Sequence, residues 1–538
     1  MSVLEDAGIG LLKAVLGKRR LNALLINRLV ASSRTRPHPW STRDDYVTWP
    51  GLKDRSYFGR LLPSTDWPGA LQPVSPPVEE VVKLFLAGVD GQRPCPKSTC
   101  LFPAFAQYLT DGFLRTRLSN VDEEEDRTRT TSNHEIDLST LYGRTDLQCQ
   151  ALRLGSQDNG QKGRLKSEVV DGEEWPLRLF LSGGEQVDPQ FLDPETGDAI
   201  LDPPLGLRHT TPQMRETLFA VGGDRVNAAP QTAMMNILFL REHNRVAGLI
   251  EQNHPDWDDD RVFETARSTL IVMFIKLVVE EYINHISTAK FELRAWPEVA
   301  WNADWNRENW MTIEFTLLYR WHSLVPQKMR WAGNEIDGNA LLLNNKVLLD
   351  GGLAEAFVDM SDNAATELGL GNAADFMAKA EMDALRQSHI NGLQSYAAYR
   401  TAMGKKVPKD FAALVGKSKD PIEQARRTAL AKNLADLYGS IDKLEFYTGL
   451  FAEPREANGP LPDLLTSMVA MDAFSQALTN PLLSEHVWGD PDVQRETFSE
   501  TGLAQIKQTS SLRDILDRNA TGLGDRFVGM TRPGWKRE

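Results

Sequence analysis

The amino-acid sequence predicts a large, mainly α-helical protein with few short strands. The chain has 538 residues, enough for two or three ordinary domains or for one large helical enzyme domain with a sizeable core. Apolar residues recur at intervals of three and four along several long segments, which is the periodicity of helices with one buried face. Strand patterns are few and short, and no internal repeat is apparent.

The first 80 residues are expected to form an N-terminal arm on a helical domain of residues 81–538. Residues 9–31 set apolar side chains against basic ones and predict an amphipathic helix. This helix either makes a peripheral membrane contact or packs on its own domain. Residues 35–80 contain many prolines, which break helices, and are expected to form an extended connector around the larger body.

Long helical segments follow the arm. A polar stretch at 155–176 interrupts them and is expected to be a solvated loop or a small hairpin. The clearest helical periodicity covers residues 100–118, 229–252, 258–288, 309–324, 371–403, 421–438 and 462–479.

Composition narrows the class of protein. The chain has 60 Lys and Arg against 74 Asp and Glu, and the formal net charge of −14 argues against a general nucleic-acid binder. The N-terminus lacks the charge order of a secretory signal, and no window holds about 18 uninterrupted apolar residues. A cytoplasmic protein without a transmembrane span is therefore expected. Cys95, Cys100 and Cys149 do not complete a zinc site and are expected to be reduced thiols.

Residues 315–326, FTLLYRWHSLVP, place Tyr319 three residues before His322 in an apolar, aromatic run. Side chains at positions i and i+3 share a helix face, so both would point the same way and Trp321 would point away. A histidine on an apolar helix is often a core residue with satisfied hydrogen bonds. A buried imidazole can also ligate heme iron through one ring nitrogen while a partner holds the other.

Several segments in order resemble the heme peroxidase and cyclooxygenase superfamily, and most of all its fatty-acid oxygenase branch. EFTLLYRWHSLVP is similar to the segment with the radical tyrosine and proximal heme histidine of cyclooxygenases, plant α-dioxygenases and fungal linoleate dioxygenases. The resemblance spans about residues 45 to 510 and implies a large helical heme-peroxidase (cyclooxygenase-like) domain. The other segments that carry it are ILFLREHNRVAGLIEQNHPDW, FETARSTLIVMFIKLVVEEYINHIS, HEIDLSTLYGRT, LADLYGSIDKLEFYTGLFAE and TNPLLSEHVW.

The resemblance assigns roles on the proximal side of a heme. His322 corresponds to the proximal iron ligand. Tyr319 corresponds to the residue that becomes a tyrosyl radical and abstracts hydrogen from a fatty acyl chain. Tyr447, in EFYTGL, matches a tyrosine near the ligand histidine, although an aromatic core residue on a helix would show the same pattern.

The distal side departs from the family pattern. In FPAFAQYLTDGFLRT, Gln107 matches the family's distal glutamine, but Asp111 stands where the family has a histidine. No histidine lies between His38 and His134, so a shifted alignment does not supply one. Arg225, in GGDRVNAAP, falls at the position of the distal arginine of mammalian-type peroxidases.

Two further departures concern the cofactor. The positions that form ester bonds to heme in relatives match Thr110 and Ala228, which have no carboxylate, so the resemblance implies a non-covalent heme b. Gly112 stands where the calcium-binding peroxidases have an aspartate, so no calcium site is predicted.

Asp111 is expected either to act as the distal acid-base group or to mark a position released from peroxide chemistry. Peroxide cleavage needs a group that takes a proton from one oxygen and delivers it to the other, with a pKa near ambient pH. Burial would raise the pKa of Asp111 and Arg225 would lower it, so the two effects oppose each other.

The substrate side resembles fatty-acid oxygenases but not prostaglandin-forming ones. DYVTWPGLKDRSYFGRLLP is similar to the sequence just after the carboxylate-binding arginine of cyclooxygenases, which makes Arg34 and Arg36 candidates, or else solvated surface charges. The tyrosine and serine of the cyclooxygenase channel correspond to Ala289 and Ala473.

The leading hypothesis is a heme-dependent fatty-acid (lipid) dioxygenase that uses a Tyr319 radical, with dioxygen or a hydroperoxide as co-substrate. A second hypothesis keeps the heme and uses Asp111 to rearrange or split a hydroperoxide, or to direct oxygen transfer to another small molecule. A third is a non-catalytic heme-binding protein.

Overall fold

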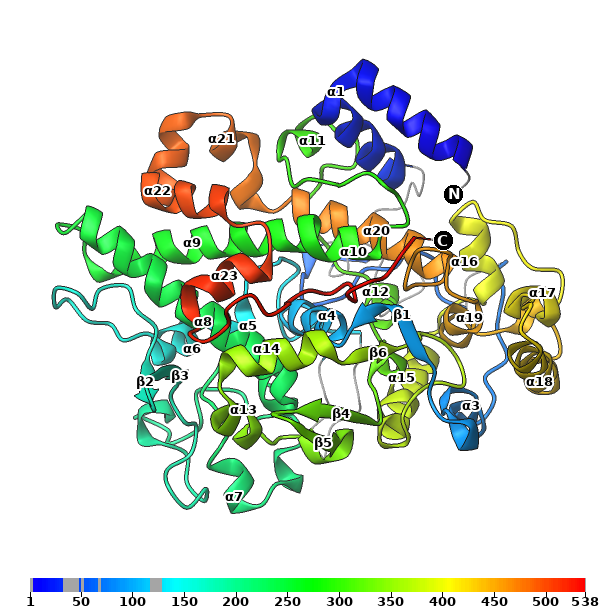
Figure 1. Cartoon of the computed structure of the whole chain (residues 1–538), viewed down its shortest axis with the longest axis horizontal. Helices are drawn as coiled ribbons and strands as arrows, with labels where there is room; N and C mark the ends of the chain where they lie inside the picture. Colours follow the sequence, from blue (N-terminus) through cyan, green and yellow to red (C-terminus); the bar gives the residue numbers. More distant parts are fainter. Residues whose placement is uncertain (1–2, 32–47, 50–52, 66–68, 117–127, 538) are drawn as a thin grey trace.

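The computed structural model describes residues 3–31, 48–49, 53–65, 69–116 and 128–537. Helices make up 52% of the chain, and the strands found in the described ranges form only small two-stranded sheets (Figure 1). The prediction of a mainly helical fold is confirmed. None of the described helices is long and apolar enough to cross a membrane.

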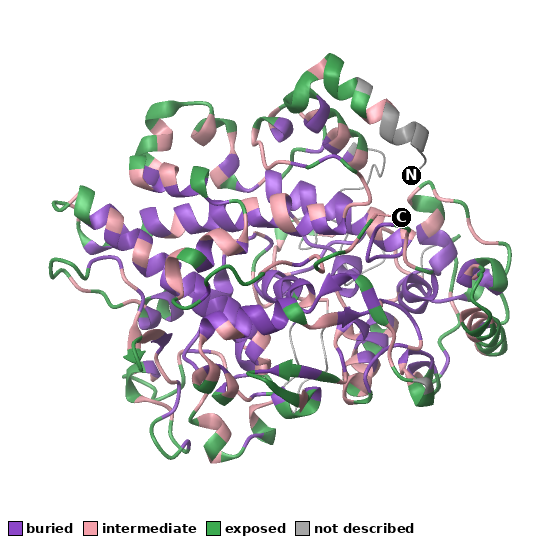
Figure 2. Ribbon diagram, in the orientation of Figure 1, coloured by how far each residue is buried: buried purple, intermediate pink, exposed green. Residues whose placement is uncertain are grey.

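The centre of the molecule is built on a pair of long helices, α8 (Pro230–Asn253) and α9 (Asp259–Leu277). Helix α4 (Leu101–Asp111) packs on α8, and α9 continues through a π-helical turn (Val278–Ile283) into α10 (Asn284–Ile286). Figure 2 shows that buried residues concentrate in these central helices, whereas exposed residues dominate the outer helices and loops.

Outer helices surround this pair. Helix α22 (Pro491–Gln508) packs on α9, and α23 (Leu512–Asn519) and α14 (Leu353–Asp362) pack on α8. The remaining helices are α3 (Val78–Phe85), α5 (Ser139–Tyr142), α6 (Asp146–Leu152), α7 (Pro212–Arg215), α11 (Glu298–Trp301), α13 (Lys346–Gly351), α15 (Ala378–Ile390), α16 (Tyr396–Ala402), α17 (Phe411–Val415), α18 (Pro421–Tyr438), α19 (Phe446–Ala452), α20 (Asp463–Leu478) and α21 (Glu485–Trp488).

Four of the expected helices match the structure closely: α8, α18, α20 and the continuous run from α9 to α10. The helix expected at 100–118 ends earlier, at Asp111. The helix expected at 371–403 begins at Ala378 and is divided into α15 and α16. Gly392 lies between them with a φ of 56°, a left-handed conformation that a helix interior does not accept.

The helix expected at 309–324 is broken at the residues of greatest interest. Helix α12 (Ile313–Leu318) starts at the N-cap Thr312, whose side chain accepts from the Phe315 amide, and it ends just before Tyr319. The indole nitrogen of Trp321 donates to the Leu318 carbonyl at 2.6 Å, which satisfies an acceptor freed at the helix end.

The prediction that Tyr319 and His322 share one helix face is therefore wrong. His322 begins a separate 3-10 turn, η6 (His322–Leu324). Trp321 does not point away either: its ring stacks on Tyr319 with centroids 4.9 Å apart. The residues remain neighbours, but a turn and an indole hydrogen bond bring them together rather than helical periodicity.

The strands in the described ranges form antiparallel pairs. Strand β2 (Ser167–Val170) pairs with β3 (Glu173–Pro176) as a hairpin within the polar stretch expected to be a loop or hairpin. Strand β4 (Lys328–Trp331) pairs with β5 (Asn334–Asp337). Strand β1 (Pro94–Thr99) pairs with β6 (Ala364–Thr366) across a long separation in the chain, with an irregular register between Pro94 and Thr99.

Helix α1 (Val3–Ala31) packs on α11 and α20 (Figure 1). Gly17, with a φ of 75°, divides it into two parts. In the second part Leu21, Ile26 and Val30 are buried, whereas Val15 in the first part is 73% exposed. The second half thus packs on its own domain, and the first half leaves apolar side chains on the surface.

Candidate active site

The small sheet of β1 and β6 connects the two sides of the candidate site. Strand β1 leads directly into α4, which carries Gln107 and Asp111. On the other strand, the Thr366 hydroxyl donates to the Ser323 carbonyl, and the Ser323 hydroxyl accepts from the Gly369 amide at 3.1 Å. Since Ser323 follows His322, the sheet fixes the turn of His322 relative to α4.

Asp111 ends α4 and is 6% exposed. Its Oδ2 atom is buried without a hydrogen-bond partner among the described residues. Burial raises the pKa of Asp111 to about 7, against the opposing effect of Arg225. The two effects foreseen from the sequence are thus both present, and burial prevails. A carboxyl group with this pKa is divided between its acid and base forms near neutral pH.

Nearby arginines do not neutralise Asp111 because other groups engage them. Arg115 pairs with Asp202 and with Asp224, each at 3.0 Å. Arg225 donates to the Leu114 carbonyl at 3.2 Å, so part of its guanidinium is held by the chain that follows α4. Arg225 is near enough to be the strongest of the effects that lower the pKa of Asp111, which places these two predicted residues in one site.

On the proximal side, Nδ1 of His322 lies 3.2 Å from Oε1 of Glu381, although the contact lacks the angles of an aligned hydrogen bond. The Tyr447 hydroxyl donates to Oε2 of the same carboxylate at 2.6 Å. Tyr447 therefore lies near His322, as expected, but reaches it through Glu381.

An apolar cavity lies between α4 and the chain that follows His322. It is lined by Ala104 and Gln107 of α4 and by Val325 and Met329 beyond the proximal turn. Gln107 is exposed on an otherwise largely buried helix, and Asp111 stands one turn further along the same face. The cavity is small, about 70 Å³, and its lining does not include His322 or Asp111.

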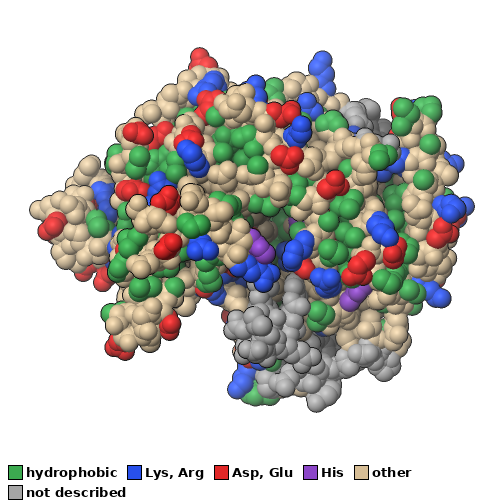
Figure 3. Space-filling view, turned by 90° about the horizontal axis from the view of Figure 1, so that it is seen from below, with side chains coloured by type: hydrophobic (Ala, Val, Ile, Leu, Met, Phe, Trp, Pro, Cys, Tyr) green, Lys and Arg blue, Asp and Glu red, His purple; other side chains and the backbone are tan. Residues whose placement is uncertain are grey.

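These residues suit a heme. The His322 side chain keeps 19% of its surface exposed, so the imidazole is not sealed in the core. Its Nδ1 side faces Glu381, which leaves Nε2 as the ring nitrogen for a metal. Seen from below, the molecule has a recess with a histidine and basic side chains at its rim (Figure 3), a surface that suits a ligand with carboxylates.

Tyr319 lies in an aromatic cluster. Its ring contacts Phe315 at 5.0 Å and Trp321 at 4.9 Å, and Trp321 in turn contacts Phe102 at 5.4 Å. Burial raises the pKa of the Tyr319 phenol above its ordinary value, and interaction with Tyr282 opposes that effect. The phenol is therefore neutral at physiological pH and lies beside a second tyrosine, the buried Tyr282.

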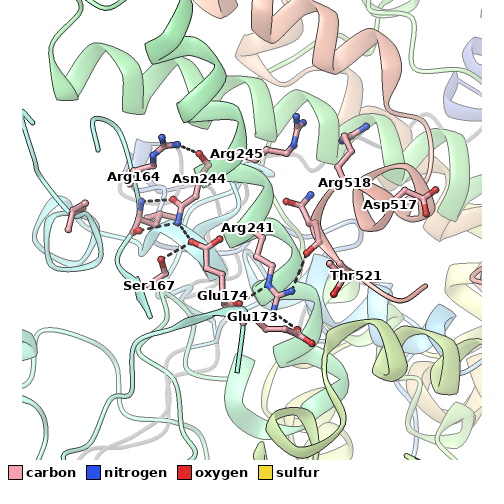
Figure 4. Close-up of a pocket in the computed structure, with 15 residues that line it drawn as sticks. Arg164, Ser167, Glu173, Glu174, Arg241, Asn244, Arg245, Asp517, Arg518 and Thr521 are labelled. Carbon is pink, nitrogen blue, oxygen red and sulfur yellow. Dashed lines mark hydrogen bonds and ion pairs between the residues drawn. The ribbon is translucent and has the colours of Figure 1, made fainter. Parts of the chain in front are cut away.

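Another cavity, of about 700 Å³, lies between α8, the β2–β3 hairpin and the chain after α23 (Figure 4). Its arginines are already engaged. Arg241 pairs with Glu173 at 2.8 Å, and Arg245 and Arg518 both pair with Glu242 at 2.7 Å. These ion pairs hold the hairpin and the C-terminal segment on α8, so the arginines that line the cavity have a structural role.

The other candidate residues are only partly placed. Arg34 and Arg36 lie outside the described residues. Ala473 is buried on α20, and Ala289 lies in the loop after α10. Cys95, Cys100 and Cys149 are buried free thiols.

Sequence analysis missed Glu381 and Tyr282. A signal for Glu381 existed, because Glu381, Ala384, Leu385 and Ser388 occupy positions i, i+3, i+4 and i+7 on the buried face of α15. Glu381 is the charged residue among these four. Tyr282 lies within a segment that reads as a plain apolar helix, and only the fold brings it to Tyr319.

Comparison with known proteins identifies the family. Residues 103–527 match the family described as animal haem peroxidase. The chain belongs to the animal haem peroxidase family. It is accordingly a heme-dependent oxidoreductase.

This peroxidase is similar to prostaglandin G/H synthases along most of its length. It is 29% identical to mouse (Mus musculus) prostaglandin G/H synthase 1 over 507 residues, covering 92% of this chain and 77% of the mouse protein. It is also 29% identical to horse (Equus caballus) prostaglandin G/H synthase 2 over 519 residues, covering 93% of this chain and 77% of that protein.

Solved structures share the fold of this peroxidase. The rice (Oryza sativa) fatty acid alpha-dioxygenase superimposes with a TM-score of 0.67 at 16% identity, covering 98% of this chain and 96% of that one. Peroxidase A from Dictyostelium discoideum superimposes with a TM-score of 0.64 at 17% identity, covering 88% of this chain and 95% of that one.

Proposed function

We propose that this peroxidase family member is a heme-dependent fatty-acid dioxygenase that works through a radical on Tyr319. The observation that carries the proposal is the placement of Tyr319 in a buried aromatic cluster directly beside the turn of His322. Relatives support the substrate class, since one solved rice fatty acid alpha-dioxygenase variant is described with palmitic acid.

His322 would hold the iron through Nε2, with Glu381 on Nδ1. When bound, the heme supplies the one-electron oxidant, formed at the expense of a hydroperoxide, that converts the Tyr319 phenol to its radical. The ring contact between Tyr319 and Trp321, and the hydrogen bond from Trp321 to α12, fix the phenol next to the ligand turn. Tyr319 is half-buried, and the rings of Phe315 and Trp321 pack against its phenol ring.

Asp111 would move the proton on the distal side. Its unpaired Oδ2 is free to accept a proton from a hydroperoxide, and a pKa of about 7 lets the same group return it. Arg225 lies close enough to stabilise negative charge that develops there. Gln107, one turn earlier on α4, lines the cavity and would orient the oxygen atoms.

The heme would be held without covalent links or a calcium ion. Thr110 has a hydroxyl, not a carboxylate, and this hydroxyl donates to the Ala106 carbonyl at 3.0 Å within α4. Gly112 presents no side chain, and its carbonyl accepts from the Ser139 hydroxyl at 2.8 Å.

The proposal is tested by supplying palmitic acid and a trace of unlabelled fatty-acid hydroperoxide, under ¹⁸O-labelled dioxygen, to the heme-loaded protein. A labelled hydroperoxide is expected from the wild type, and none from Tyr319→Phe. Tyr142→Phe is a matched control: it removes a buried hydroxyl that is hydrogen-bonded to His243, outside the aromatic cluster, and should keep the product. Label in the product of Tyr319→Phe would exclude the Tyr319 radical.

A second candidate function is the rearrangement or splitting of a lipid hydroperoxide, or oxygen transfer from it to another small molecule. The observation that favours it is Asp111 itself, whose raised pKa supports peroxide chemistry whether or not dioxygen is used. Under this alternative, the wild type would consume a fatty-acid hydroperoxide without taking up label, and Tyr319→Phe would remain active.

A further inference from the structure

We propose that Glu381 and Tyr447 are positioning residues that set the electron-donating strength of His322 toward heme iron. Glu381 would strengthen the donation through the approach of its Oε1 to within 3.2 Å of Nδ1, and Tyr447 would moderate it by donating to the same carboxylate. The inference rests on His322 being the iron ligand in the proposed function, and it adds a control on that ligand.

The first step is the burial of Glu381. This residue is 1% exposed, and a buried carboxylate is costly unless neighbouring donors or positive charges compensate it. The structure gives each of its oxygens one neighbour of that kind. Oε1 faces Nδ1 of His322 at 3.2 Å, and Oε2 accepts from the Tyr447 hydroxyl at 2.6 Å.

Packing between helices holds the side chains of Glu381 and Tyr447 in place. Glu381 is on α15, which packs against α19, the helix that carries Tyr447. Tyr447 is fully buried and its ring stacks on Phe85 with centroids 5.4 Å apart. A hydroxyl held this firmly keeps the carboxylate in one orientation, so Oε1 stays directed at the imidazole.

A carboxylate next to a histidine ligand changes how strongly the imidazole donates electrons to the metal. A carboxylate that accepts from Nδ1–H fixes the tautomer and places more electron density on Nε2, which makes the imidazole a stronger donor to the metal. A stronger donor stabilises ferric over ferrous iron and lowers the reduction potential. A hydroxyl that donates to the same carboxylate draws charge away from Oε1 and weakens the effect.

Glu381 and Tyr447 therefore change the electron-donating strength of His322 in opposite directions. A merely structural role would not produce this difference. Glu381→Gln replaces the carboxylate with a neutral, weaker acceptor of nearly the same shape. Tyr447→Phe leaves the carboxylate with one donor fewer and a stronger hold on His322. Loosening of the pocket alone would shift the reduction potential of both variants in the same direction.

The chain offers a matched control at a second histidine. Glu445 is also 1% exposed, and it contacts Nε2 of His389 at 2.7 Å and accepts from the Tyr438 hydroxyl. It thus repeats the grouping of histidine, glutamate and tyrosine at another histidine. Glu445→Gln removes an equivalent buried charge and should leave the iron unaffected.

The test measures the ferric/ferrous potential by spectroelectrochemistry, and the iron–histidine stretching frequency of the ferrous protein by resonance Raman, on heme-loaded full-length chains. Relative to wild type, Glu381→Gln should raise the potential and lower the frequency. Tyr447→Phe should lower the potential and raise the frequency. Glu445→Gln should match the wild type in both.

An unchanged potential and frequency in Glu381→Gln, or a shift of Tyr447→Phe in the same direction as Glu381→Gln, would overturn the proposal. If Glu381→Gln does not retain heme, the potential of Tyr447→Phe tests the proposal alone: a lower potential than wild type supports it, and a higher one overturns it. A His322→Ala variant distinguishes failures: an unchanged heme spectrum there rejects the ligand assignment and the proposed function with it. Loss of heme in His322→Ala, combined with no shift in Glu381→Gln, rejects the control by Glu381 alone.

Discussion

Asp111 has a buried, unpaired Oδ2 and a pKa raised to about 7, which suits the acid-base role proposed for it. The carboxylate form is the base, and its fraction rises with pH through the pKa. We expect the rate of heme oxidation by hydrogen peroxide, followed by stopped-flow absorbance, to rise between about pH 6 and pH 8. Asp111→Asn should lower the rate by about 100-fold or more and remove this pH dependence.

A matched control for this prediction is Glu281→Gln. Glu281 is half-buried, and desolvation raises its pKa to about 7 as well, but it accepts from the Leu512 amide, where α23 begins. Its removal should leave the pH profile intact. A wild-type profile in Asp111→Asn would show that the position has been released from peroxide chemistry.

The cofactor gives a second prediction at the residue scale. Because neither Thr110 nor Ala228 supplies a carboxylate, acidified acetone should extract the heme completely as unmodified heme b. Incubation with EDTA should leave the heme spectrum and the melting temperature unchanged, since no calcium ion is expected. Heme that stays with the protein after extraction, or a fall in melting temperature with EDTA, would contradict these expectations.

At the scale of elements, hydrogen bonds far apart in sequence hold the site in place. Thr366→Val removes the donor to the Ser323 carbonyl and leaves a buried acceptor unpaired, which costs about 1–3 kcal/mol. We expect a lower melting temperature and faster transfer of heme to apomyoglobin. Thr428→Val, on the exposed helix α18, removes a hydroxyl that donates to the Gln424 carbonyl and should change neither. Heme transfer at the wild-type rate from Thr366→Val would show that β6 does not position the proximal turn.

The individual elements also show which parts of the fold and of the candidate site could be predicted from the sequence. Apolar periodicity predicted α8, α18 and α20, although α8 and α20 are buried on nearly every side and α18 buries only Leu434 and Tyr438. It failed at residues 319–322, where the Trp321 indole ends α12. Motif order identified Tyr319, His322, Gln107, Asp111 and Tyr447 as candidates. The structure places Gln107 and Asp111 on one helix and brings Tyr447 to the glutamate that faces His322. Glu381 was missed because its contact with His322 joins residues far apart in the sequence, and only the fold brings them together.

At the scale of the whole molecule, the second half of α1 is buried against the domain and the first half is exposed. Leu21 is fully buried, so Leu21→Ala should lower the free energy of unfolding by about 2–5 kcal/mol, measured by urea denaturation. Leu12 and Val15 are 42% and 73% exposed. Changing both to Ser should leave that free energy within about 0.5 kcal/mol of the wild type.

We propose that this exposed first half of α1 makes a peripheral membrane contact, beside the basic residues Lys13 and Lys18. The double Ser variant should then bind anionic lipid vesicles more weakly than wild type in a sedimentation assay. Equal binding would assign α1 a purely internal role.

The central claim is that a radical forms on Tyr319, next to the ligand turn. The most direct test is freeze-quench electron paramagnetic resonance of the heme-loaded protein, mixed with a fatty-acid hydroperoxide in the absence of fatty acid. The account predicts a tyrosyl radical signal in the wild type and in Tyr142→Phe, and its loss in Tyr319→Phe. The same signal in Tyr319→Phe, or no protein radical in the wild type, would contradict it.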